Sequence, residues 1–207
     1  MSMNLNDYKS GDGEKKDYGR LEDGSYPARI VQLINIGRQY ATDFKTGEIK
    51  TYDDGNPVIQ TKMFVTWEFP TETIDYNGEE MPRWYSKEFT VSAHEKAALP
   101  QLLKVAGVTN GDITQMINAP MLVTIGSTST GKAKVTGYTQ LPKGMEVPEL
   151  VNEAKVFDPY NPDMDVYNSL PNFIQNKITE AVDYNKMPLS KGQQKQAEPE
   201  LDDDIPF

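Results

Sequence analysis

Residues 58–69, Val58-Ile-Gln-Thr-Lys-Met-Phe-Val-Thr-Trp-Glu-Phe69, alternate between apolar and polar side chains. Side chains of a β-strand point alternately to its two faces, so a period of two predicts a strand with one buried face. The expected buried face carries Ile59, Met63, Val65, Trp67 and Phe69. The opposite parity carries Gln60, Lys62, Phe64, Thr66 and Glu68, so Phe64 shares a mostly polar face with Lys62.

Similar apolar runs predict further strands before and after this one. They cover residues 26–36, 83–91, 120–126 and 132–141. The segment 38–57 is rich in turn residues and predicts a long loop after the first strand. Asn77-Gly78 predicts a turn between the second and third strands.

One helix is expected between the third and fourth strands. Ser92 and Glu95 have the spacing of a capping box, and Gly107 is suited to end the helix. Pro100 is expected to kink it, because proline lacks a backbone N–H and clashes with the preceding turn.

The predicted order is therefore three strands, a helix and two strands. This is the order of the OB-fold, a five-stranded barrel with its helix between strands three and four. We expect a mainly β fold with added helices, in which residues 25–141 form such a barrel. A β-meander with one helix is the alternative, and the long first loop together with the position of the helix favours the barrel.

The flanking segments differ from this central part in composition. Residues 1–24 are polar and predict a flexible N-terminal arm. Residues 142–185 predict a helical extension, with a short helix at 147–156 and an amphipathic helix at 169–184. Packing of this extension on the barrel is favoured over partner binding. Residues 186–207 predict a linker and a disordered acidic tail.

The formal net charge of -10 argues at first against a nucleic-acid ligand. Its distribution weakens that argument. Residues 25–140 carry 11 Lys and Arg against 12 Asp and Glu, so the central part is almost neutral. Residues 198–207 carry five acids and no cation, which is half of the net charge.

Several classes of protein are disfavoured by what the sequence lacks. The absence of cysteine excludes disulfides, a thiol nucleophile and thiolate metal sites. No apolar stretch approaches the length of a membrane span, and the first residues have no signal-peptide core, so we expect a cytoplasmic protein. His94 is the only histidine, and no nucleophile, metalloprotease or phosphate-loop motif occurs. We expect no enzyme activity, no cofactor and no metal.

Binding of a single nucleic-acid strand requires cations along its backbone and aromatic faces for its bases. The predicted first loop contributes Arg38, Tyr40, Phe44, Lys45, Lys50 and Tyr52. The predicted strands contribute Lys62, Phe64, Trp84, Lys87, Lys132, Lys134 and Tyr138. The parity of the last strand places Lys132, Lys134 and Tyr138 on one face. Burial is the alternative for Phe64 and Trp84.

The final residues suggest a binding partner. Asp202-Asp-Asp-Ile-Pro-Phe207 resembles the C-terminal tip of bacterial single-stranded DNA-binding proteins, which recruits replication, recombination and repair proteins. The resemblance implies partner binding by Asp202, Asp203, Asp204, Ile205, Pro206 and Phe207. Acidic residues are suited to steer the encounter, and Phe207 to fill an apolar pocket.

The whole chain resembles a bacteriophage single-stranded DNA-binding protein, through the segment Leu21-Glu-Asp-Gly-Ser-Tyr-Pro-Ala-Arg-Ile-Val-Gln-Leu-Ile34 and the terminal six residues. The resemblance implies sequence-independent coating of single-stranded DNA during replication and recombination. The chain differs from the cellular proteins in its longer N-terminal arm, its helical extension and its shorter linker. A protein-binding adaptor with an OB-like domain and a strand-annealing recombination protein remain as alternatives.

Overall fold

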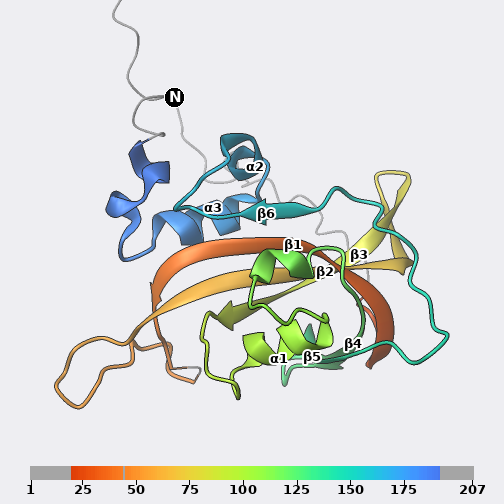
Figure 1. Cartoon of the computed structure of the whole chain (residues 1–207), viewed down its shortest axis with the longest axis horizontal. Coiled ribbons are helices and arrows are strands. Elements are labelled where there is room, and N and C mark those ends of the chain that lie inside the picture. The colour runs from red at the N-terminus through yellow and green to blue at the C-terminus, as the bar shows by residue number, and fades with distance from the viewer. Residues whose placement is uncertain (1–19, 44, 192–207) are drawn as a thin grey trace, which may run out of the picture.

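The computed structural model describes residues 20–43 and 45–191, and these form a mainly β structure, as predicted (Figure 1). Five strands pair antiparallel in the order β3-β2-β1-β4-β5, and a sixth, β6, pairs parallel with β1. Their bounds are β1 Gly24–Tyr40, β2 Ile59–Tyr76, β3 Glu79–Thr90, β4 Pro120–Ser127, β5 Ala133–Thr139 and β6 Lys155–Phe157. The expected succession of three strands, a helix and two strands is present.

Short helices lie in two places along the described chain. Helix α1, Ala98–Val105, and the 3₁₀ turn η2, Ile113–Met116, connect β3 to β4. Helices α2, Met164–Asn168, and α3, Asn172–Thr179, follow β6, and the 3₁₀ turn η3 spans Tyr184–Lys186. The second and third strands are longer than expected and meet at Asn77 and Gly78, whose φ angles of 56° and 89° suit a two-residue hairpin.

Helix α1 begins later than the capping-box pattern predicts. Its N-cap is Ala97, which has no side-chain cap, while the Ser92 hydroxyl accepts a hydrogen bond from the backbone N–H of His94. Because the helix begins at Ala98, Pro100 lies in its first turn, where no intrahelical N–H bond is lost. The expected kink is therefore absent.

The helix expected at 147–156 was also wrong. Backbone groups that such a helix would pair internally are hydrogen-bonded to side chains of the sheet instead. Arg29 donates to the carbonyls of Val147 and Pro148, and Glu68 accepts from the N–H of Val151. Proline at 148 lacks an N–H of its own. The segment runs extended across the sheet and ends in β6.

Two hydrophobic cores share β1 and β2. The first contains Met63, Val65, Trp67 and Phe69, the parity expected to be buried, packed with α1 and β4. The second joins residues of the opposite face to the extension: Ile34, Ile36 and Phe64 pack with Phe157, Tyr167, Ile174, Ile178 and Met187. Figure 1 shows β6, α2 and α3 on one side of β1, with α1, β4 and β5 on the other. Both faces of this strand pair are thus covered.

The extension differs from its prediction in length. Helix α3 ends at Thr179, well before Tyr184, and leaves Phe173 at 57% exposure. Packing also continues past 186, where a linker was expected, because Met187 and Leu189 are fully buried.

Candidate functional site

Side chains of β3 and β5 meet on the inner side of the sheet. The Lys87 Nζ lies 5.4 Å from the ring centroid of Phe89 and 5.7 Å from that of Tyr138. Tyr138 also stacks on Trp67, with 6.2 Å between centroids, and donates its hydroxyl proton to the carbonyl of Ala98 at 2.7 Å. We name the group formed by Lys87, Phe89, Lys134 and Tyr138 the β3–β5 seam.

The seam holds two positive charges and no carboxylate. Partial burial lowers the pKa of Lys87 below its ordinary value of 10.5, and the charge of Lys134 lowers it further. Burial likewise raises the pKa of Tyr138, which favours the neutral phenol. Across residues 20–43 and 45–191, no Asp or Glu forms an ion pair with either lysine. This environment favours an anion from outside the chain.

The position of Tyr138 corrects the expected strand face. The pairing of β4 with β5 shifts between Thr124↔Gly137 and Ile125↔Val135, so Thr136 is an extra residue in β5. A bulge of this kind reverses the side-chain parity along a strand. Tyr138 therefore packs on the core, as Val135 does, while Lys134 is exposed and Lys132 is exposed in the loop before β5.

Lys62 and Phe64 lie on the face that the extension covers. The Lys62 Nζ is 2.7 Å from the Glu88 carboxylate, which Lys177 approaches at 3.8 Å. Phe64 is only 9% exposed, and its ring meets that of Phe173 edge-on at 6.2 Å. The structure thus corrects the expectation that Phe64 offers an open face to a base, because α3 packs over it.

Trp84 is partly exposed to solvent, and its indole N–H is hydrogen-bonded to a buried carboxylate. Its ring is on the outer face of β3 with the residue 38% exposed, and its Nε1 donates to Glu68 at 2.9 Å. Glu68 is 0% exposed and also accepts from the backbone N–H groups of Val151 and Asn152 and from the Asn152 amide. Sequence reasoning missed Glu68, since alternation places it on a solvent-facing parity.

The segment between β1 and β2 projects from the body of the structure as a narrow ribbon (Figure 1). Isolated bridges join Thr42 to Ile49 and Thr51 to Pro57. The expected loop starts later than predicted, because Arg38 and Tyr40 are the last residues of β1 and pair with β2. Both are exposed, as are the ribbon candidates Lys45, Lys50 and Tyr52, and Phe44 lies outside the described residues.

Acids outnumber cations on this ribbon. Lys45 and Lys50 stand against Asp43, Glu48, Asp53 and Asp54. Backbone N–H groups donate to Asp43 and Asp54 and lower the pKa of both carboxyls, so both stay charged. The ribbon can therefore contribute an aromatic surface, through Tyr52 at 59% exposure, more readily than positive charge.

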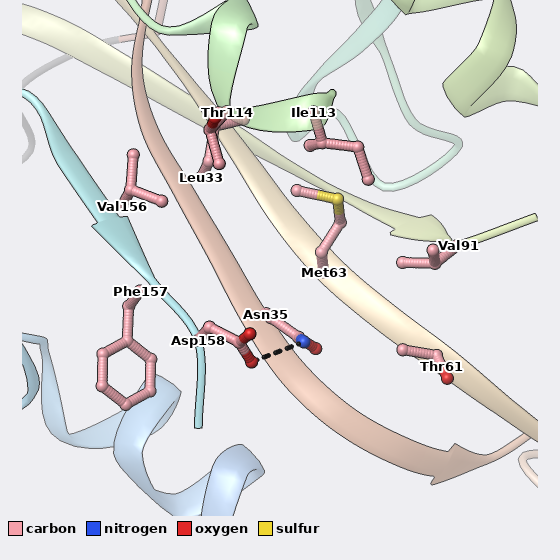
Figure 2. A pocket seen from close by; sticks show the side chains of 10 residues that line it. All are labelled: Leu33, Asn35, Thr61, Met63, Val91, Ile113, Thr114, Val156, Phe157 and Asp158. Atoms are coloured by element: carbon pink, nitrogen blue, oxygen red, sulfur yellow. Dashed lines mark hydrogen bonds between the residues drawn. The ribbon is translucent and has the colours of Figure 1, made fainter. Parts of the chain in front are cut away.

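An apolar cavity of about 200 Å³ opens near η2 and β6 (Figure 2). Its walls include Leu33, Met63, Ile113 and Phe157. Its one ionisable lining residue is Asp158, which accepts a hydrogen bond from Asn35 at 3.1 Å. None of the described residues that line it is a cation, so its wall is unsuited to a phosphate and differs from the seam.

No protein-family model, curated protein or solved structure matches the chain. No helix in the described ranges is long and apolar enough to cross a membrane. The expected partner-binding residues 202–207 lie outside the described part of the chain.

Proposed function

We propose that the protein binds single-stranded DNA without sequence preference and coats it during replication and recombination. Within this proposal β1–β5 form a five-stranded OB-fold barrel. The strand order and the position of α1 between β3 and β4 are those of the fold. Barrel closure requires β3 to approach β5, and the contacts of Lys87 and Phe89 with Tyr138 support it.

The two lysines of the β3–β5 seam, which form no ion pair with a carboxylate of the described residues, carry the proposal. Holding Lys87 partly buried beside Lys134 costs free energy through desolvation and like-charge repulsion. A phosphate in contact with both ammonium groups offsets these costs. The rings of Phe89 and Tyr138 fix the lysine stem, so the charge is already placed before the ligand arrives. On the same strand Trp84 presents a ring to solvent, and bases stack on such rings.

The test is the salt dependence of binding to an oligothymidylate of about 30 nucleotides, which exceeds the roughly 4–16 nucleotides that one OB-fold covers. Fluorescence of Trp84 reports the binding. For single strands each phosphate contact contributes about 0.7 to the slope of log K against log salt. The double variant Lys87→Met/Lys134→Met, which keeps apolar stems, should lower that slope by about 1.4 if each lysine contacts one phosphate.

The matched control is Lys143→Met/Lys186→Met, which removes the same charge from two exposed positions outside the seam. This control variant should keep most of the slope of log K against log salt. An equal loss of slope in both double variants would show that net charge, and not the seam, governs binding. Failure of the unaltered protein to bind the oligonucleotide would refute the proposal and favour a protein-binding adaptor.

The proposal also assigns partner recruitment to the acidic segment 198–207. Because its five acids compete with a polyanion for the same cations, deletion of this segment should tighten DNA binding at low salt. Unchanged affinity would argue against the competition and leave recruitment as the role of the segment, to be measured as capture of replication proteins.

A further inference from the structure

We propose that Phe173 of the C-terminal extension, carried by α3 over the outer face of β2 and β3, is a second base-stacking platform in addition to Trp84. This inference rests on the proposed single-strand binding. It gives the extension, whose packing covers β1 and β2, a direct part in the interface.

Phe173 is placed as a stacking ring should be. It is 57% exposed, although Ile174 next to it is buried in the second core. The edge-on contact with Phe64, at 78° between ring planes, supports the ring from below without covering it. An exposed aromatic ring that is held from one side offers a face to a base at little cost in side-chain entropy.

The contacts of α3 show which way this ring faces. Lys177 lies four residues after Phe173, and residues at this spacing share one side of a helix. The Lys177 Nζ reaches the Glu88 carboxylate on β3 at 3.8 Å. The side of α3 that carries Phe173 is therefore turned toward β3, the strand that also carries Trp84.

The register gives the spacing of the two strand positions that lie behind these rings. Phe64, beneath Phe173, pairs with Glu88, and Glu68 pairs with Trp84, so the two positions are four residues apart along β3. At about 3.3 Å per residue they are roughly 13 Å apart. This is too far to sandwich one base, so each ring takes its own. Between them Ser86 is exposed and bonded to Thr66 at 2.8 Å, which leaves a polar floor.

This surface supplies stacking without net charge. Two lysines stand against two carboxylates here: Lys62 and Lys177 both approach Glu88, and Glu68 is buried behind Trp84. Loss of Phe173 should therefore weaken binding while the salt slope, which is set by the seam lysines, stays the same. A change that merely disturbed the fold would alter both.

The experiment moves the fluorescent reporter to position 173. Trp84→Phe removes the exposed tryptophan and leaves Trp67, which is 0% exposed. Phe173→Trp in this background should be quenched by oligothymidylate. Tyr160→Trp is the control: Tyr160 is 40% exposed on the same extension but bonds to Asp183, whose charge repels phosphate, and it should not be quenched. In the Trp84-containing protein, Phe173→Leu should weaken binding about 5- to 140-fold with an unchanged salt slope.

Each result decides between the two proposals. If the protein binds and Trp84 is quenched, but Phe173→Trp is silent or Phe173→Leu binds normally, only the role of Phe173 is refuted. Equal quenching at positions 160 and 173 also refutes it, because the signal then does not depend on the stacking site. If the unaltered protein does not bind, the proposed function fails and this inference fails with it.

Discussion

Lys62 and Lys87 lie on neighbouring strands and on opposite faces, and their surroundings differ. Lys62 is held 2.7 Å from Glu88, beneath the extension. Lys87 lies against two rings, beside another lysine, with no carboxylate bound to it in the described chain. A lysine with its own partner contributes to stability, whereas an unpaired, partly buried one lowers it. The difference separates Lys62, whose ion pair stabilises the packing of the extension, from Lys87, which is suited to an anionic ligand.

The strongest test of the covered face is Glu68→Ala. The change leaves four buried or partly buried N–H donors without their acceptor, so the free energy of unfolding should fall by about 2–4 kcal/mol. Urea unfolding measures it, and Trp84 emission should shift as the indole loses its partner. Glu80→Ala, at an exposed position near the β2–β3 turn, is the control and should change stability little. An equal loss of stability in Glu68→Ala and Glu80→Ala would contradict the structural role assigned to Glu68.

Replacement of each lysine by methionine should move stability in opposite directions. Lys62→Met breaks the contact with Glu88 and should cost about 1–2 kcal/mol. Lys87→Met removes a desolvated charge and its repulsion with Lys134, so stability should rise by up to about 1 kcal/mol while DNA binding weakens. The gain should shrink as pH rises toward 10.5, because Lys87 then loses its proton in the unfolded chain as well. A loss of stability in Lys87→Met would contradict the comparison.

The smallest effect concerns Tyr160 on the extension. Burial, together with the hydrogen bond to Asp183, raises the pKa of Tyr160 from 10.0 to about 12. A raised phenol pKa stabilises the fold fully below pH 10, and this contribution is lost between pH 10 and 12. Tyr160→Phe should therefore be less stable than the unaltered protein at pH 9 by under about 1 kcal/mol. Urea titrations of both proteins at pH 9 and near pH 12 should show that this difference in the free energy of unfolding disappears at the higher pH. A difference that does not change with pH would mean that packing of the ring, and not the phenol proton, causes it.

Much of the fold follows from local patterns, and the exceptions have physical causes. The alternation of residues 58–69 identified the inner face of β2, and Asn77-Gly78 identified the hairpin. The outer face was harder to predict, because the residues that cover it come about 100 positions later in the chain. Phe64, an aromatic on a mostly polar parity, was one sign of this cover.

The candidate site was predicted less well than the fold. A bulge at Thr136, which has no sequence signature of its own, turned Tyr138 inward. The sequence pattern predicts an exposed acid at Glu68, because the segment around Asn152 that bonds to it is remote in the sequence. Lys87 and Lys134 were named from sequence, yet the sequence does not show that no carboxylate within residues 20–43 and 45–191 pairs with them, because this depends on tertiary contacts.

The two faces of β1 and β2 are covered by segments that the ribosome makes at different times. Both strands are complete once Tyr76 has been added, but the second cover ends with Met187 and Leu189. At about 5–20 residues per second, ribosomes need roughly 6–23 s for the intervening chain. During that time Ile34, Ile36 and Phe64 lie on an uncovered face. A nascent chain that stalls after β5 would therefore expose an apolar sheet face, to which chaperones and other nascent chains can bind.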